Sequence, residues 1–424
     1  MNTANSRLYR LQVIALLTLC NFINAVDRTS LSVAVPFIIK DFHINTATMG
    51  VALSAFFWTY LLCNVPAGNL ADRFGSKKVL GWSLGLWSVF SAVTGFAQNV
   101  VHIMLARIGV GMGESAVLPC NAKIAANNFP SSERATVMAV ALCGIRLGSA
   151  AAPIIMAFLI QRWGWREAFI VTGLGSLLWC VVWYFGFKES ATNTTTAAKG
   201  KERVKVPWKV IATNKTLLNL TVVKFAQDYL MTVFTTWVPA YLIMGRGFSV
   251  VTMGFYMSAA YATSAISQPL VGMLSDWLIR RGWNLNRARK VVLVSLQLIS
   301  SSIIITGFSD RAGVALLFLV VAISAEANCS AVTWTIISDV VPGKLVGSVA
   351  GAMNSIGAAS SIIAPIVTGI IVKVTGSFQM AFTLGGCAML VAAILTLFVV
   401  PALALQETLS AQGVPVPAVE EVNA

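Results

Sequence analysis

The sequence predicts an all-α polytopic membrane protein, with twelve transmembrane helices in two pseudo-symmetric six-helix bundles. Three observations carry this prediction. The 424 residues are 57% hydrophobic and only 11% charged, apolar blocks recur along the whole chain, and motifs in the first half return in the second. A bilayer core of ~30 Å needs about 20 apolar residues per helix, and blocks of that size exclude a soluble domain.

About twelve apolar blocks reach the length of a membrane span. The first follows a basic start with Arg7 and Arg10 and lacks a small-residue cleavage site, so we expect a retained helix and no signal peptide. The blocks lie at 11–31, 47–67, 79–99, 101–121, 135–159, 167–187, 217–243, 252–274, 290–308, 312–337, 346–373 and 379–403.

Basic residues predict the orientation, because Lys and Arg accumulate in cytoplasmic loops. Of the 30 Lys and Arg residues, twenty fall on the side that holds the N-terminus, six on the other side, and four within spans. This pattern favours a multi-pass membrane protein with both termini in the cytoplasm. The net charge of +14 is then a topology signal and indicates no nucleic-acid partner.

Cysteine and histidine give no sign of a metal, redox or catalytic centre. The seven cysteines are scattered singly without C-x-x-C pairs, and His43 and His102 lack a partner that would make either a catalytic base. We therefore expect no enzyme, no metal site and no cofactor.

The longest polar stretch between spans, 188–215, divides the apolar blocks into six and six. We expect an N-terminal bundle at 1–187, a cytoplasmic linker at 188–215 and a C-terminal bundle at 216–404. The polar, acidic stretch 405–424 is typical of a disordered cytoplasmic tail.

The two halves share loop motifs. "GNLADRFGSKK" begins at Gly68 after the second block, and "GMLSDWLIRRGWNLNRARK" begins at Gly272 after the eighth. Related bundles of this kind are the repeat arrangement of alternating-access transporters.

These motifs resemble the major facilitator superfamily. "GNLADRFGSKK" is similar to its loop signature, and "RIGVGMGES" (107–115) to its fourth-helix signature. More narrowly, "VDR", "SAFFWTYLLCNVPAG", "FPSSERA", "TWVPAYL" and "GSVAGAMNSIGAASSIIAP" resemble the anion:cation symporter family, which includes bacterial galactonate, glucarate and hexuronate transporters. The resemblance runs from about residue 10 to 403 and implies a functional monomer.

Eight charged residues fall inside the predicted spans. A charge at the bilayer centre costs at least ~2.5 kcal/mol, so such residues normally face a polar cavity or pair with one another. They are Asp27, Arg28, Arg107, Glu114, Arg146, Lys224, Asp228 and Glu326.

Arg107 and Glu114 are seven residues apart and share one helix face. They could form a fixed ion pair that ties the fourth helix to the first. Alternatively, Glu114 and Asp27 carry protons, poised between burial, which favours the neutral acid, and a nearby guanidinium, which favours the carboxylate. Because Asp27 and Arg28 diverge by about 100° around their helix, we expect Arg28 to face an anion and Asp27 to face Arg107. The resemblance implies that Asp27 and Glu114 carry the proton and that Arg28 contacts the substrate carboxylate.

Further polar residues are candidates for the substrate site. Asn24 lies one turn before Arg28, and Tyr60 and Asn64 share a face of the second helix. Asn354 lies among glycines that allow close helix contact. The resemblance places Tyr60 and Asn354 at the cavity, although each of these residues could also serve packing.

Four intramembrane charges depart from the sugar-acid transporters or are peculiar to this chain. Arg146 stands where those transporters commonly have Gln or Ser, Lys224 and Asp228 could pair one turn apart, and Glu326 lies in "SAEANCS". Either they form a structural charge network, or Arg146 and Lys224 bind a second acidic group of the substrate.

The loop motif predicts a gate. Its glycines let the second helix end sharply, and Asp72 can sit beside a helix N-terminus or an Arg of the adjoining helix. A latch that breaks during transport is the functional interpretation; for Lys77 and Lys78 we prefer a purely topological role. The gating candidates are Gly68, Asp72, Arg73, Gly75 and Asp276.

The function that the sequence favours is a symporter that imports an organic anion, a sugar acid or other carboxylate, with protons as the coupling ion. The alternatives are an organic anion/phosphate antiporter, in which Arg28, Arg107 and Arg146 clamp the phosphate, and a symporter for aromatic or dicarboxylic acids. The sequence leaves open which carboxylate is carried and how many protons move with it.

Overall fold

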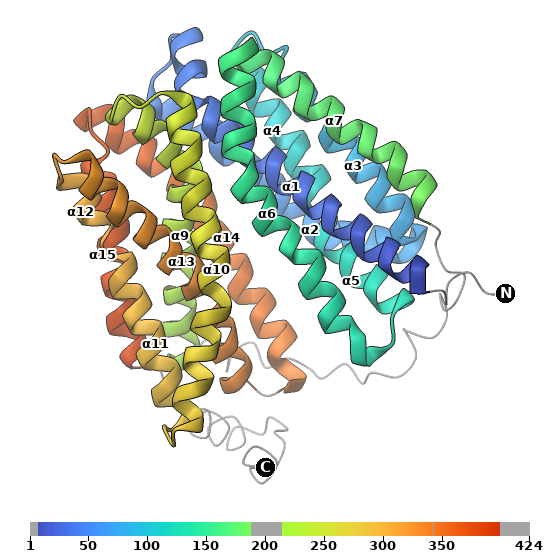
Figure 1. Ribbon diagram of the computed structural model, residues 1–424, viewed down its shortest axis with the longest axis vertical. Coiled ribbons are helices and arrows are strands. Elements are labelled where there is room, and N and C mark those ends of the chain that lie inside the picture. The colour runs from blue at the N-terminus through green and yellow to red at the C-terminus, as the bar shows by residue number, and fades with distance from the viewer. Residues whose placement is uncertain (1–6, 188–213, 342, 399–424) are drawn as a thin grey trace. The chain divides into compact units, whose positions relative to one another are not determined.

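The computed structural model describes residues 7–187, 214–341 and 343–398. The predicted tail, and all of the predicted linker except residues 214 and 215, lie outside this part of the chain. Within it, all regular structure is helical (Figure 1). The helices are α1 (Arg7–Asp41), α2 (Thr46–Phe74), α3 (Ser76–Thr94), α4 (Val100–Glu114), α5 (Val117–Asn128), α6 (Ser131–Trp163), α7 (Trp165–Gly186), α9 (Lys215–Ala240), η2 (Tyr241–Gly245), α10 (Val250–Arg280), α11 (Leu285–Ser300), α12 (Ile303–Phe308), α13 (Ala312–Val340), α14 (Gly343–Thr375) and α15 (Gln379–Leu397).

Nine segments of the described chain are long and apolar enough to cross a membrane. They are α1, α2, α4 with α5, α6, α7, α11 with α12, α13, α14 and α15. The remaining long helices, α3, α9 and α10, cover the predicted blocks at 79–99, 217–243 and 252–274. Each predicted block therefore corresponds to a helix, and two of the blocks contain a break.

The chain forms two compact units. Unit 1 holds residues 7–187, 235–262 and 365–377, and unit 2 holds residues 214–234, 263–364 and 378–398, counting described residues only. The predicted bundles at 1–187 and 216–404 stay a prediction.

Glycines bring the helices of unit 1 close enough to position charged side chains. α1 packs along α6 (Figure 1), where Gly144 faces the Thr18 carbonyl and Gly148 faces the Phe22 carbonyl, with no room for a side chain. On α4, an added Cβ at Gly113 would lie 2.8 Å from the Ser83 carbonyl oxygen of α3. At these contacts α1 packs directly against the backbone of α6, and α4 against that of α3. The close packing surrounds the charged residues of α1 and α4.

Candidate functional site

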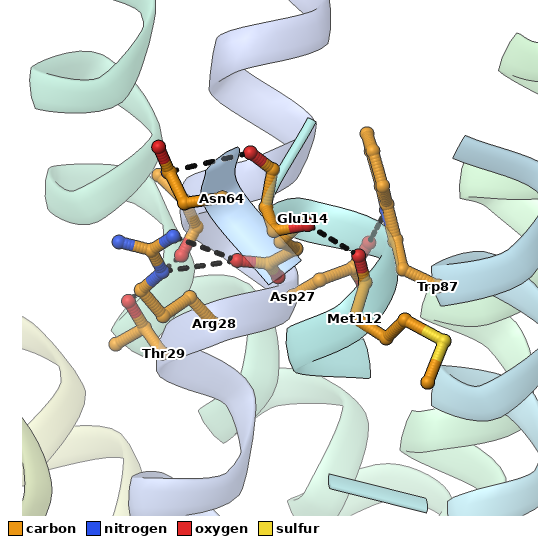
Figure 2. A network of polar contacts seen from close by, with 9 residues as sticks. Asp27, Arg28, Thr29, Asn64, Trp87, Met112 and Glu114 are labelled. Carbon is orange, nitrogen blue, oxygen red and sulfur yellow. Dashed lines mark hydrogen bonds and ion pairs between the residues drawn. The ribbon is translucent and has the colours of Figure 1, made fainter. Parts of the chain in front are cut away.

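An ion pair between α1 and α4 forms the centre of the site. Arg28 donates from Nε and Nη2 to Oε2 of Glu114, at 3.0 and 2.9 Å (Figure 2). The Glu114 side chain is fully buried, whereas 40% of the Arg28 side chain is exposed. The pair thus joins a hidden acid to a base that solvent can reach.

Aromatic rings of α2 cover one side of the Arg28 guanidinium. Its carbon lies 5.0 Å from the centre of the Phe56 ring and 4.9 Å from that of Tyr60, and the two rings stack 5.4 Å apart. Such cation–π contacts contribute roughly 0.5–2 kcal/mol and orient the guanidinium. Tyr60, a predicted site residue, therefore lies beside Arg28.

The helix is interrupted where Glu114 sits. α4 ends at Glu114 and α5 begins at Val117, although the sequence predicted one continuous span over 101–121. In this break, the Ser115 carbonyl accepts a 3.4 Å hydrogen bond from Asn64, and its hydroxyl donates to the Met112 carbonyl at 2.7 Å. Asn64 therefore supports the break beside Glu114 (Figure 2).

Asp27 does not pair with Arg107 as predicted. Its carboxyl is 1% exposed and accepts hydrogen bonds from Trp87 Nε1 at 3.1 Å, Ser91 Oγ at 3.2 Å and Ser176 Oγ at 2.8 Å. The donors come from α3 and α7, so Asp27 points into the helix bundle and away from Arg28. Sequence reasoning missed all three donors, because no spacing within one helix reveals a partner on another.

Arg107 is buried without an ion-pair partner in the described chain. Its Nε and Nη2 have no hydrogen-bond partner, and its guanidinium carbon lies 5.8 Å from the Phe169 ring centre. Glu114 and Asp27 nevertheless lie close enough to its guanidinium to interact with it electrostatically. The predicted tie between the fourth and first helices exists, but Arg28 makes it with Glu114, and Arg107 does not.

Asn24 and Arg146 occupy different surroundings. Asn24 is 4% exposed and lies against Glu114, yet its Nδ2 makes no hydrogen bond. Arg146 is half-buried on α6 and pairs with no acid among the described residues. Because Gly144 faces α1, Arg146, two residues on and about 200° around the helix, faces away from α1.

In unit 2, the predicted Lys224–Asp228 ion pair forms one turn apart on α9. The Lys224 ammonium lies 5.5 Å from the centre of the Trp334 ring. Glu326 of α13 forms no ion pair with Lys224 and accepts a hydrogen bond from Ser300 Oγ at 3.2 Å. Asn354 of α14 is exposed.

Two of the gating candidates, Asp72 in unit 1 and Asp276 in unit 2, make ion pairs. Asp72 pairs with Lys123 of α5 at 2.9 Å, and Lys123 also donates to the Ala71 carbonyl at 2.6 Å. The ion-pair partner of Asp72 is thus a Lys of α5 where the sequence suggested an Arg; its predicted place beside a helix N-terminus stays a prediction. In unit 2, Asp276 pairs with Arg289 at 3.2 Å.

The other residues of the loop motif shape the end of α2. α2 ends at Phe74 and is capped by Gly75, whose φ of 88° lies in the left-handed region that favours glycine. Gly68 lies one turn before Asp72, and the guanidinium of exposed Arg73 lies 5.2 Å from the ring centre of Phe74. No group of three or more His, Cys, Asp or Glu residues that could hold a metal ion occurs in the part of the chain searched.

Charged groups in the interior of a bundle of membrane-spanning helices, such as the Arg28–Glu114 pair, are typical of a polytopic membrane transporter. Residues 17–365 match the Major Facilitator Superfamily. The chain is 31% identical over 411 residues to a probable galactarate/D-glucarate transporter of Bacillus subtilis (strain 168), covering 91% of this chain and 90% of the relative. It is 32% identical over 387 residues to a hexuronate transporter of the same organism, covering 89% and 91%.

A solved structure shares the fold. The bacterial homologue of the human lysosomal transporter Spinster, in an inward-facing and occupied conformation, superposes with a TM-score of 0.76 at 18% identity, over 98% of this chain and all of that one. The predicted all-α major facilitator fold is confirmed. The chain belongs to the Major Facilitator Superfamily, a family of membrane transporters and not of enzymes.

Proposed function

We propose that this protein is a secondary transporter that imports an organic anion together with protons by alternating access. The substrate that we propose is a sugar acid. We place it in a bacterial inner membrane as a monomer with both termini in the cytoplasm. The single observation that carries the proposal is the Arg28–Glu114 pair, in which a solvent-reachable cation is held by a fully buried acid.

This geometry couples an anion to a proton by competition. Arg28 offers five N–H donors and uses two of them on Glu114. An incoming carboxylate needs the same fork, so it competes with Glu114 for the guanidinium. A proton on Glu114 removes the competing charge, so proton binding and anion binding favour each other.

The relatives support the class of substrate. Their names give galactarate, D-glucarate and hexuronates, which are all sugar acids. Galactarate and D-glucarate carry two carboxylates and glucuronate carries one, and each of them offers the carboxylate that Arg28 could hold. We therefore take all three as candidate substrates.

The test is uptake by the purified full chain in proteoliposomes with the outside more acidic. Galactarate or D-glucarate should accumulate, and a protonophore should abolish the accumulation. Phosphate-driven exchange without any response to the pH gradient would replace the symporter with the antiporter.

The Glu114→Gln variant tests the coupling acid. We expect counterflow exchange to survive, because the amide mimics the protonated acid, and pH-driven accumulation to be lost. Glu133→Gln is the matched control, since Glu133 pairs with Arg10 away from the site. Retained accumulation in Glu114→Gln would remove Glu114 from the proton path.

A further inference from the structure

The intramembrane charges do not balance within the units. Unit 1 holds three bases and two acids, and unit 2 holds one base and two acids. Lys224 is the base of unit 2, and Asp228 and Glu326 are its acids. If both acids were ionised, the interior of unit 2 would carry one uncompensated negative charge.

Lys224 is committed to Asp228. The two form an ion pair on one face of α9, and the Lys224 side chain is only 4% exposed. Gly357 of α14 leaves the space that the Asp228 carboxylate occupies, because a Cβ atom at this position would collide with Oδ2. The Trp334 ring of α13 makes a cation–π contact with the Lys224 ammonium. The pair is therefore fixed by three helices.

Glu326 has no such partner. It lies in the middle of α13, is 1% exposed, and its flanking residues Ala325 and Ala327 are buried too. It accepts a hydrogen bond from the hydroxyl of Ser300 of α11, at 3.2 Å, and this donor carries no charge. An ion buried with so little compensation costs several kcal/mol, whereas a neutral carboxylic acid does not.

Among the described residues, Lys224 and Asp228 of α9 are the charged groups whose interaction with Glu326 matters most. α10 packs beside Glu326 through the hydrogen bond from Asn328 to Ser267, and its charged residues, Asp276 and Arg280, lie nine and thirteen residues beyond Ser267. On α13 itself, the Cys329 thiol lies one turn away from Glu326.

α12 and α15 carry no charged residue. The bases of α11 end at Lys290, ten residues or ~15 Å along the helix from Ser300. On its own helix, Asp339 is thirteen residues away and lies 3.5 Å from Arg289.

We propose that Glu326 is a second proton-binding site of the transport cycle, separate from the Arg28–Glu114 pair. The proton binds to the carboxylate from water and returns to water when a change in the surroundings lets Lys224 compensate the ionised acid. This inference rests on the proposed function. It adds one proton per transported substrate to the proton that Glu114 carries.

Infrared spectroscopy of the purified full chain tests the site without transport. At neutral pH, the wild type should show a protonated carboxyl band that is absent in Glu326→Gln. Asp228→Asn should also weaken this band, because Lys224 keeps its charge and can then neutralise an ionised Glu326. A spectrum that neither substitution alters would overturn the proposal, even if pH-driven uptake is confirmed.

Transport measurements test the coupling. With the membrane potential clamped at zero, loss of one coupled proton should lower accumulation about tenfold per unit of pH gradient. We expect this loss in Glu326→Gln and wild-type accumulation in Glu133→Gln. Unchanged accumulation in Glu326→Gln, or an uptake that depends on Na⁺ and loses this dependence in the variant, would overturn the proposal. Failure of the wild type to respond to pH would instead overturn the proposed function.

Discussion

At the scale of single residues, the site depends on an unequal ion pair. Arg28 meets solvent and two aromatic rings, while Glu114 is enclosed at a helix break. Because only one partner is reachable, an anion can approach the base without first exposing the acid. The unequal burial of the two partners, more than the pair itself, suits Arg28 to receive a carboxylate.

Arg28→Lys should weaken substrate binding although it keeps the charge. A lysine ammonium cannot make the planar two-donor contact, and a charge-assisted hydrogen bond contributes about 1.5–3 kcal/mol. We expect roughly a 10- to 100-fold rise in Kd, measured by equilibrium binding to the purified protein. Arg28→Ala should abolish binding. The control Arg10→Lys should bind the substrate with the wild-type Kd. A wild-type Kd for Arg28→Lys would exclude a two-donor contact between the Arg28 guanidinium and the substrate carboxylate.

Ser176→Ala should reveal the charge of Asp27. Ser176 makes the shortest of the three hydrogen bonds to that carboxyl. A bond to a carboxylate contributes about 1.5–3 kcal/mol, and a neutral one about 0.5–1.5 kcal/mol. A carboxyl that exchanges a proton is neutral at acidic and ionised at alkaline pH, so a drop in the thermal midpoint that is larger at alkaline pH is expected if Asp27 exchanges a proton. An equal drop across the pH range would mean that Asp27 keeps one charge state throughout.

At the scale of elements, glycines of α4 place the Arg28–Glu114 pair. Gly111 packs on the Phe56 carbonyl of α2, and Gly113 packs on Ser83 and Trp87 of α3. The same two glycines precede the break at Glu114. The α4 motif therefore sets both the helix spacing and the position of the acid.

Gly111→Ala should destabilise the protein. The added methyl group would meet the Phe56 carbonyl oxygen and the Thr59 hydroxyl, and overpacking of this kind costs about 1–3 kcal/mol. Gly175→Ala on α7 is the matched control, because nothing lies within 4 Å of its Cβ position. A lower unfolding temperature for Gly111→Ala alone supports the close contact; equal temperatures would contradict it.

Local patterns in the sequence predicted local structure well. The apolar blocks predicted the helices, and the spacing of Lys224 and Asp228 predicted their pair. Partners on other helices were harder, because periodicity within one helix does not say which neighbour it meets. Asp27 was therefore given Arg107 in place of Trp87, Ser91 and Ser176, and the break at Glu114 was missed.

At the scale of the whole molecule, distant segments meet inside unit 1. The Thr46 hydroxyl donates to the Gly369 carbonyl at 2.8 Å, across 323 residues of sequence. Next to it, Gly50 packs on the Pro365 carbonyl, and Trp237 Nε1 donates to the same carbonyl at 3.1 Å. The start of α2 thus packs against the last part of α14 without intervening side chains.

Gly50→Val should loosen this contact. A branched side chain there would occupy the place of the Pro365 carbonyl, so α2 and α14 could not approach as closely. Thr46→Cys offers the readout, because Thr46 is 8% exposed and its replacement should react slowly with a maleimide. We expect faster labelling when Gly50→Val is added and no change when Gly175→Val is added. Equal labelling rates in all three would mean that the contact is open in the membrane.

The half-buried Arg146 has a consequence for kinetics. Unit 1 carries one more intramembrane base than acids, so its empty site presents a positive potential to approaching anions. Mobile ions screen such a field over a Debye length of ~8 Å at physiological ionic strength. Uptake at low substrate concentration should therefore fall as salt rises, while the rate at saturation should hold. Arg146→Gln should flatten the salt dependence; a slope equal to that of the wild type would show that other charges attract the substrate. If the slope does flatten in Arg146→Gln, the unpaired Arg146 raises the rate at which anions reach the site, before any of them binds.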